Sequence, residues 1–435
     1  MNTTTYYKLT FIGVLLLQGC GSTSTTPQTQ EDTTPIISTT QKQHTQESNA
    51  ITILNSIRKN VGLIPLIQNK LLNQSALNHA QYLDENNLSG HIEESSKIDF
   101  TGINPVDRTT YVGYKSQKIL ENVSVGQKDE TASIDGLMGA IYHRNAFLAF
   151  DINVIGYGDK NKHYVYNMGN SKLNALCDKE SFEGIGKYYT NVCSNAEFQV
   201  EYKSYNKALN SVALQNPSII FYPYQNQQNV TPVFYEESPD PLPLQSVSGI
   251  PISVAFNKYD FNSSLLTLTK FELYNAKKES LELAFFNNGS SVLQQNNDLN
   301  NEFTPLQFAI FPKQRLDYNA TYTASIQYTY KNKIFTKQWS FTTKALKNFI
   351  VYRNQTLYLT LAKTYFIYIK PLNENDTITH IGVKCSYQSG GDVNINTSLE
   401  DRNTIQLKVN GRGVESCTLS VLKSDNSTQD IELDF

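Results

Sequence analysis

The stretch that decides the fold runs through residues 50–170 and contains four short segments: Ser89-Gly90-His91, Glu121-Asn122-Val123-Ser124-Val125-Gly126, Ile141-Tyr142-His143-Arg144 and His163-Tyr164-Val165-Tyr166-Asn167-Met168. Of the six histidines in the chain, four lie in this stretch, at positions 79, 91, 143 and 163. The turn, helix and strand signals around these segments would bring distant polar groups into one cleft. This is therefore the part of the chain in which we look first for chemistry.

Apolar residues in the same stretch follow helical spacing three times. The predicted helices carry Ile51, Leu54, Ile57 and Val61, then Leu72, Ala76, Ala80 and Leu83, then Ile134, Leu137, Met138 and Ile141, the last helix closing at His143-Arg144. Residues 154–158 and 163–168 predict two strands joined by the turn Asp159-Lys160-Asn161-Lys162. Helices followed by a short antiparallel sheet are typical of an α+β fold.

The four segments occur in a characteristic order, with Pro105-Val106-Asp107-Arg108 and Val112-Gly113-Tyr114 between the first two. In this order they resemble the bacterial branch of the CAP superfamily, the group of cysteine-rich secretory proteins, insect venom allergens and pathogenesis-related plant proteins. The resemblance covers roughly residues 51–170, and we assign a CAP domain to residues 49–175. It implies a three-layer α-β-α sandwich.

The resemblance also implies a central cleft. In CAP proteins a histidine at the first of these places, a glutamate in the Glu-Asn segment, a second glutamate and a histidine heading a His-Tyr strand converge there. His91, Glu121 and His163 match three of these positions. The second glutamate has no match, because residues 137–141 contain no acid, and His143 follows shortly after, as a histidine does in many bacterial members. The predicted site is therefore His91, Glu121, His143 and His163.

Other polar residues of the stretch receive a structural interpretation. His79 lies on the apolar face of the second predicted helix, where a lone histidine is more often a hydrogen-bonded core residue than a ligand. Pro105 and Asp107 fit the first turn of a helix, so we assign no chemical role to Asp107 or Arg108.

The chemistry of the predicted site has two interpretations. Imidazoles and one carboxylate suit one Zn²⁺ ion with an open fourth position, for which His91, Glu121, His143 and His163 are the candidate ligands. The same groups, hydrogen-bonded to one another, can instead hold loops in place as a buried polar network. The chain has neither a His-Glu-x-x-His helix motif nor a Gly-x-Ser-x-Gly elbow.

The start of the chain predicts the compartment. Residues 1–20 contain one lysine and the apolar run Phe11-Ile12-Gly13-Val14-Leu15-Leu16-Leu17, which is too short to span a bilayer and is typical of a signal peptide. Leu17-Gln18-Gly19-Cys20 resembles a lipobox, in which cleavage leaves Cys20 as a lipid-modified N-terminus; the alternative is an ordinary signal with an incidental cysteine. Residues 21–48 are rich in Ser, Thr, Gln and Pro and predict a disordered linker. We therefore expect lipid anchoring to a bacterial membrane, outside the cytosol.

The other four cysteines agree with export. They fall in two local pairs, and we predict the disulfides Cys177–Cys193 and Cys385–Cys417. The absence of a Cys-x-x-Cys motif argues against a thiolate zinc site.

Beyond the CAP domain the chain changes composition. Residues 176–216 predict a connecting module. After residue 217, short strand signals rich in Tyr, Phe, Thr and Val recur, and we predict an immunoglobulin-like β-sandwich over 217–345 and a second β-sandwich over 346–435. The segment around Trp339 resembles the last strand of bacterial immunoglobulin-like domains.

Charge excludes one class of partner and leaves three functions open. A net charge of -3 gives no basic footprint for nucleic acid. The leading hypothesis is a membrane-anchored lipoprotein that binds an extracytoplasmic ligand or protein through the His/Glu cleft and is not an enzyme. The alternatives are a zinc-dependent hydrolase of peptides or cell-wall material, with Glu121 as general base, and an adhesin that uses its β-domains.

Overall fold

A computed structural model describes residues 48–243, 245, 247–287, 298–372 and 376–435 of the chain. The predicted signal peptide with Cys20, and residues 21–47 of the predicted linker, lie outside the described residues. Within the described ranges, no helix is both long and apolar enough to cross a membrane. Glu47–Phe435 cluster into one compact unit, to which every element named below belongs.

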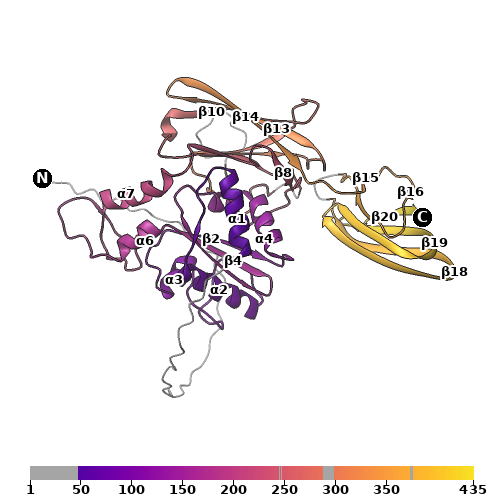
Figure 1. Cartoon of the computed structure of the whole chain (residues 1–435), viewed down its shortest axis with the longest axis horizontal. Helices are drawn as coiled ribbons and strands as arrows, with labels where there is room; N and C mark the ends of the chain where they lie inside the picture. Colours follow the sequence, from indigo (N-terminus) through magenta and orange to yellow (C-terminus); the bar gives the residue numbers. More distant parts are fainter. Residues whose placement is uncertain (1–47, 244, 246, 288–297, 373–375) are drawn as a thin grey trace, which may run out of the picture. The chain divides into compact units, whose positions relative to one another are not determined.

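Helices and a four-stranded sheet form the first part of this unit (Figure 1). The helices are α1 (Asn49–Asn60), α2 (Lys70–Glu85), α3 (Pro105–Tyr111), α4 (Glu130–Gly139) and α5 (Ile141–Phe147). The strands are β1 (Ile67–Gln68), β2 (Ile119–Val125), β3 (Val154–Lys160) and β4 (His163–Gly169), in the order β1-β3-β4-β2. The predicted turn between the last two strands is present, with Asn161 and Lys162 at positive φ.

Side chains of β4 alternate between the two faces of this sheet. Tyr164, Tyr166 and Met168 join a core cluster that contains residues of α1 and α4, whereas Val165 packs with residues of α2. Figure 1 shows α1 and α4 on one side of β2 and β4, and α2 and α3 on the other. The three-layer α-β-α sandwich expected from the resemblance is therefore confirmed.

Helix α2 lies directly on strand β3, which requires glycine at two positions. A Cβ atom on Gly156 would lie 1.9 Å from the backbone carbon of Leu72, and one on Gly158 would lie 2.2 Å from the backbone nitrogen of Leu77. Any larger residue would push the helix away from the sheet.

The third predicted helix is two helices. Ala140 has φ -83° and ψ 125°, so the chain leaves helical geometry between α4 and α5, and the prediction of one continuous helix through Ile141 is wrong. Because Ala140 provides no side-chain cap, the first amides of α5 need acceptors from elsewhere. Those acceptors come from a distant segment, described below.

A short module follows the CAP-like part. It contains α6 (Ser171–Cys177), the strand pair β5 (Tyr188–Tyr189) and β6 (Val200–Glu201), and α7 (Tyr202–Ala213). The predicted disulfide between Cys177 and Cys193 is present and joins the end of α6 to the following loop.

The next region is a sandwich of two four-stranded sheets. Its elements are β7 (Ile219–Tyr222), β8 (Gln227–Val230), β9 (Ile252–Phe256), the short helix η1 (Ser263–Leu265), β10 (Leu266–Tyr274), β11 (Leu283–Asn287), β12 (Gln307–Pro312), β13 (Thr321–Tyr330) and β14 (Lys333–Thr343). The sheets are β10-β13-β14-β8 and β11-β12-β9-β7, and one core cluster contains side chains of both. Trp339 on β14 lies in this core and donates to the carbonyl of Pro223 at 2.8 Å.

The last region is also all-β, but its strands belong to one hydrogen-bonded sheet. They are β15 (Phe349–Val351), β16 (Leu357–Tyr358), β17 (Thr364–Tyr368), β18 (Ile378–Asp401), β19 (Thr404–Lys423) and β20 (Thr428–Asp434). The first part of β19 pairs with β17 and its last part with β20, while β18 pairs along almost its whole length. The predicted disulfide Cys385–Cys417 is present and connects opposite positions of β18 and β19.

Candidate functional site

The site is built on Glu121, which lies in the middle of β2 with its side chain 1% exposed. Arg108 of α3 is fully buried and donates from Nη2 to both carboxylate oxygens of Glu121, at 2.7 and 2.8 Å. From Nη1 the same guanidinium donates to the carbonyl of His91 at 2.9 Å. The amide of Asn167, opposite Glu121 on β4, fits its neighbours best with its nitrogen 2.9 Å from Glu121 Oε2.

These partners determine the charge state of Glu121. Burial alone would raise the pKa of its carboxyl, but Arg108, His91 and His79 outweigh burial and lower the pKa to about 2. Glu121 is therefore an ionised, fully engaged carboxylate at neutral pH.

Behind Glu121 lies a second buried pair. His79 of α2 places Nδ1 2.8 Å from Glu93 Oε1 and Nε2 2.9 Å from the carbonyl of Gly90. The other oxygen of Glu93 accepts from the backbone of Thr101 at 2.8 Å. Both ring nitrogens of His79 therefore lie within hydrogen-bond distance of an oxygen, which holds the ring in one orientation.

Four buried groups form one network. Arg108 and His79 lie among the carboxylates of Glu93 and Glu121, all with side chains at most 1% exposed. A buried ionic network is stable only when every member is paired in this way. The prediction that His79 is a hydrogen-bonded core residue is confirmed, although that core residue supports the site.

His91 marks the boundary between this network and solvent. It follows Gly90, which has φ +102°, and its side chain is 38% exposed. Its Nδ1 lies 3.0 Å from Glu121 Oε1. Since the carboxylate is an acceptor, Nδ1 carries the proton of this hydrogen bond.

His143 lies opposite His91. It belongs to α5, and its carbonyl accepts from the side-chain amide of Asn122, next to Glu121 on β2, at 2.9 Å. The two imidazole rings have centroids 6.4 Å apart and planes 26° apart. The structure therefore brings together three of the four predicted site residues, namely His91, Glu121 and His143.

His143 also binds a carboxylate from far along the chain. Its Nδ1 lies 2.9 Å from Glu237 Oε2, and Glu237 accepts from the backbone amides of Ile141 at 2.6 Å and Tyr142 at 3.1 Å. Glu237 thus caps α5 and orients His143 at once, and its side chain is 2% exposed.

His163 requires a correction. In the ladder between β2 and β4, Glu121 pairs with Asn167 whereas His163 pairs with Val125, four residues further along. At about 3.3 Å per residue this separates His163 from Glu121 by roughly 13 Å. Its Nδ1 lies instead 3.1 Å from the carbonyl of Lys160 and 3.7 Å from Asp84. His163 therefore lies apart from His91, Glu121 and His143.

One candidate ligand, Glu121, is not free to bind a zinc ion, because both of its oxygens accept from Arg108. His91 and His143 each face a carboxylate through Nδ1, as metal-binding histidines commonly do, and Nε2 takes no part in these two contacts. Among the described residues, no group of three or more histidines, cysteines or acids is placed to hold a metal ion.

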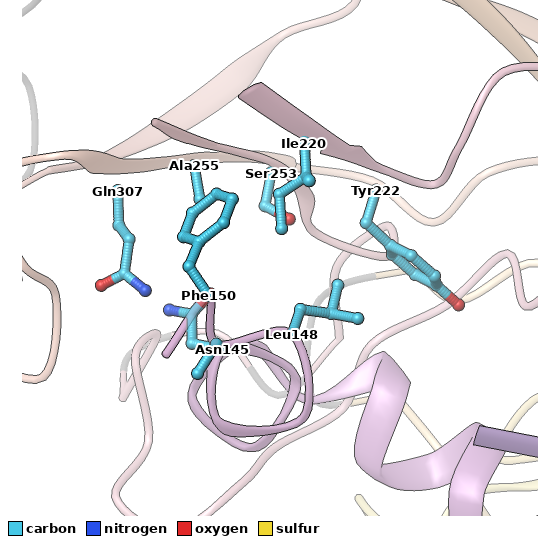
Figure 2. A pocket seen from close by; sticks show the side chains of 9 residues that line it. Asn145, Leu148, Phe150, Ile220, Tyr222, Ser253, Ala255 and Gln307 are labelled. Carbon is cyan, nitrogen blue, oxygen red and sulfur yellow. The ribbon is translucent and has the colours of Figure 1, made fainter. Parts of the chain in front are cut away.

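The two hollows described for the chain lie elsewhere. One cavity, of about 30 Å³, lies between the segment after α5 and the sandwich strands. Figure 2 shows side chains that line it, among them Leu148 and Phe150 from the first and Ile220 and Ser253 from the second. This volume is close to that of one water molecule. A wider groove of about 550 Å³ lies in the connecting module, between Phe182 and Phe198. Neither hollow is lined by His91 or His143.

The family model for CAP, the cysteine-rich secretory protein family, matches residues 51–172. These residues contain the α-β-α sandwich and the His91, Glu121 and His143 cluster. The chain therefore carries a CAP domain, followed by all-β regions. Its two disulfides are typical of proteins that fold outside the cytosol.

Similar solved structures cover only parts of the chain. An extracellular protein containing an SCP domain, from Bacillus anthracis str. Ames, is 22% identical over 28% of this chain and 38% of its own, with a TM-score of 0.26. A pair of tandem titin Ig domains is 9% identical over 50% of this chain and 94% of its own, with a TM-score of 0.17. An endo-fucoidan hydrolase of glycoside hydrolase family 107 is 10% identical over 57% of this chain and 40% of its own, also at 0.17. The chain thus covers well under two thirds of the length of the Bacillus anthracis protein. A search of curated proteins found no match.

Three residues of the site were not predicted. Arg108 lies in the last turn of α3, where a basic residue is ordinary, and the predicted helix start with Pro105 in its first turn is present. Glu93 follows His91 closely, and an acid beside a turn carries no specific signal. Glu237 lies 94 residues from His143, a separation that no local pattern bridges.

Proposed function

We propose that the protein is a lipid-anchored, extracytoplasmic binding protein whose CAP domain presents His91 and His143 to a ligand. The observation that supports binding over turnover is the engagement of Glu121. Both of its oxygens accept from Arg108, and its pKa of about 2 makes it a poor proton acceptor near neutral pH. The alternative function, a hydrolase, would need Glu121 to act as the general base.

The exposed part of the cleft consists of two imidazoles on a rigid base. His91 is half-exposed and His143 is partly exposed, while the carboxylates behind them are buried. Fixed side chains of this kind lose little conformational entropy when a ligand binds. This arrangement favours recognition of a polar group at the mouth of the cleft.

The anchor rests on the sequence alone. The lipobox-like segment ending at Cys20, followed by a polar linker of about the length of residues 21–48, would hold the folded part away from the bilayer. Cys20→Ser should move the protein from the membrane fraction to the soluble extracytoplasmic fraction. Recovery of the variant in salt-washed membranes would contradict the anchor.

Binding is tested with immobilised protein and fractions of the cell envelope. His91→Ala and His143→Ala should each reduce retention of envelope material by at least tenfold, while His163→Ala, outside the cleft, should not. The hydrolase would replace the binding function if peptides or peptidoglycan were turned over and Glu121→Gln abolished that turnover without altering retention.

A further inference from the structure

Two matching carboxylate–imidazole pairs face each other through their rings. In one, Glu121 accepts from Nδ1 of His91 at 3.0 Å; in the other, Glu237 accepts from Nδ1 of His143 at 2.9 Å. The glutamates are 1% and 2% exposed, and each is held by further donors, Arg108 in the first pair and the first amides of α5 in the second. The histidine rings, 6.4 Å apart, are the exposed parts of both pairs.

The two pairs come from different regions of the chain. Glu121, His91 and His143 lie within the matched CAP residues 51–172, and Glu237 lies beyond them, in the segment between β8 and β9 of the sandwich. The same segment reaches the last region, where Glu236 pairs with Arg402 at 2.5 Å. One short segment therefore contacts both neighbouring regions of the chain.

We propose that Glu237 is a positioning residue of the ligand cleft, supplied by the β-sandwich region, and that the completed cleft takes a cationic, hydrogen-bond-donating group such as an ammonium. This inference rests on the proposed binding function and assigns its ligand class. The binding unit is then the CAP domain together with the sandwich.

The hydrogen bonds determine what the cleft offers a ligand. With Nδ1 of each ring donating to a carboxylate, a neutral imidazole has its lone pair on Nε2. In that neutral form His91 and His143 each present an acceptor, and together they suit a group with at least two N–H donors. Without Glu237 the ring of His143 could turn or exchange tautomers, and the pair of acceptors would be lost.

Charge around His143 selects the sign of the ligand. Besides Glu237, Asp298 accepts from the hydroxyl of Tyr142 at 2.6 Å. Glu302 is close enough that burial, followed by Asp298 and Glu237, raises its pKa. Arg144 offsets one of these negative charges, because it interacts electrostatically with Glu237. Its guanidinium donates hydrogen bonds to backbone carbonyls. The surroundings of His143 therefore remain negative, which favours a cation.

The positioning role is tested by nitrogen NMR on the full-length chain labelled with ¹⁵N-histidine, at about pH 8. The signals of His143 are assigned by their loss in His143→Ala. In the wild-type protein they should show the Nδ1–H tautomer. Glu237→Gln should shift the population towards Nε2–H at His143 and leave His91 unchanged. Glu236→Gln is the matched control, since it alters a neighbouring, exposed carboxylate, and should leave both rings unchanged.

The tautomer of His143 distinguishes a positioning role of Glu237 from a purely structural one. If the role were purely structural, Glu237→Gln would lower the unfolding midpoint without changing the tautomer of His143. An unchanged tautomer in Glu237→Gln, or an equal change in Glu236→Gln, overturns the proposal.

The ligand class is tested by titrating the same sample with methylammonium chloride and, at equal ionic strength, with sodium acetate. Methylammonium should shift the Nε2 signals of His91 and His143 with a saturable curve, and its Kd should rise at least tenfold in Glu237→Gln. A saturable response to acetate, or to neither ion, overturns the assignment of a cationic ligand. If the wild-type protein retained envelope material but did not respond to methylammonium, this inference alone would be contradicted and the proposed function would stand.

Discussion

Arg108 donates from one nitrogen, Nη2, to both carboxylate oxygens of Glu121, at 2.7 and 2.8 Å, with both side chains buried. This contact joins α3 to β2, at the edge of the sheet, and determines the position of the loop that carries His91, whose carbonyl accepts from the same guanidinium. The rigid base of the cleft therefore depends on an ion pair, and the first two predictions concern it.

Loss of Arg108 should leave Glu121 buried and uncompensated. We expect Arg108→Met to lower the free energy of unfolding by roughly 3–5 kcal/mol, measured by urea denaturation. Arg108→Met combined with Glu121→Leu should recover a large part of that loss, because no unpaired charge remains. Additive losses in the double variant would show that the two residues are not coupled.

The stability of the protein should fall in acid through Glu121. Its pKa is lowered from 4.5 to about 2 in the folded state, so its stabilisation is present above about pH 4.5 and is lost as the pH falls towards 2. The shift corresponds to a contribution on the order of 3 kcal/mol. Denaturation at several pH values should show the gap between wild type and Glu121→Gln narrowing across this window. A gap that is constant with pH would contradict the assigned charge state.

The sequence predicted the layers better than the site. Periodicity identified α1 and α2, and strand alternation with a polar turn identified β3 and β4, because each of these signals is local. The break at Ala140 was missed, since the acceptor that permits a new helix start there is the carboxylate of Glu237, far away in sequence.

The site was predicted where its residues lie in one recognisable segment. His91, Glu121 and His143 all follow from the resemblance. His163 was misplaced because a His-Tyr strand start suggests a cleft residue, whereas the register with β2 sets it opposite Val125. Register is a tertiary property that a single strand does not encode.

The contact between α2 and β3 should be intolerant of any added atom. Gly156→Ala places a Cβ 1.9 Å from the backbone of Leu72, so we expect a loss of roughly 3 kcal/mol or more in unfolding free energy. Gly139→Ala is the control, since nothing lies within 4 Å of its Cβ, and alanine should be neutral or slightly stabilising there. Equal effects of the two changes in thermal denaturation would contradict this packing.

The two disulfides should each stabilise their own region. Cys177 and Cys193 are separated by 16 residues, and the loop-closure model assigns such a link roughly 3 kcal/mol. Cys177→Ser with Cys193→Ser should expose residues 176–216 to limited proteolysis and leave the hairpin of β18 and β19 protected. The converse is expected for Cys385→Ser with Cys417→Ser, and peptide mapping without reductant should find no crossed link.

Zinc uptake distinguishes the buried network from a metal site. Glu121 is bound by Arg108, and His163 lies roughly 13 Å from it along the sheet. We therefore expect chelator-treated protein, dialysed against about 1 µM Zn²⁺, to bind far less than one ion per chain, well below the affinity of structural zinc sites. His163→Ala should not change the measured zinc content, and neither should His91→Ala. Stoichiometric uptake that disappears in His91→Ala and His143→Ala would show that the two imidazoles bind a metal, through Nε2 while Nδ1 keeps its carboxylate, and would replace the network interpretation. Uptake that disappears in His163→Ala alone would instead locate a metal beside Asp84, 3.7 Å from that histidine and away from the cleft.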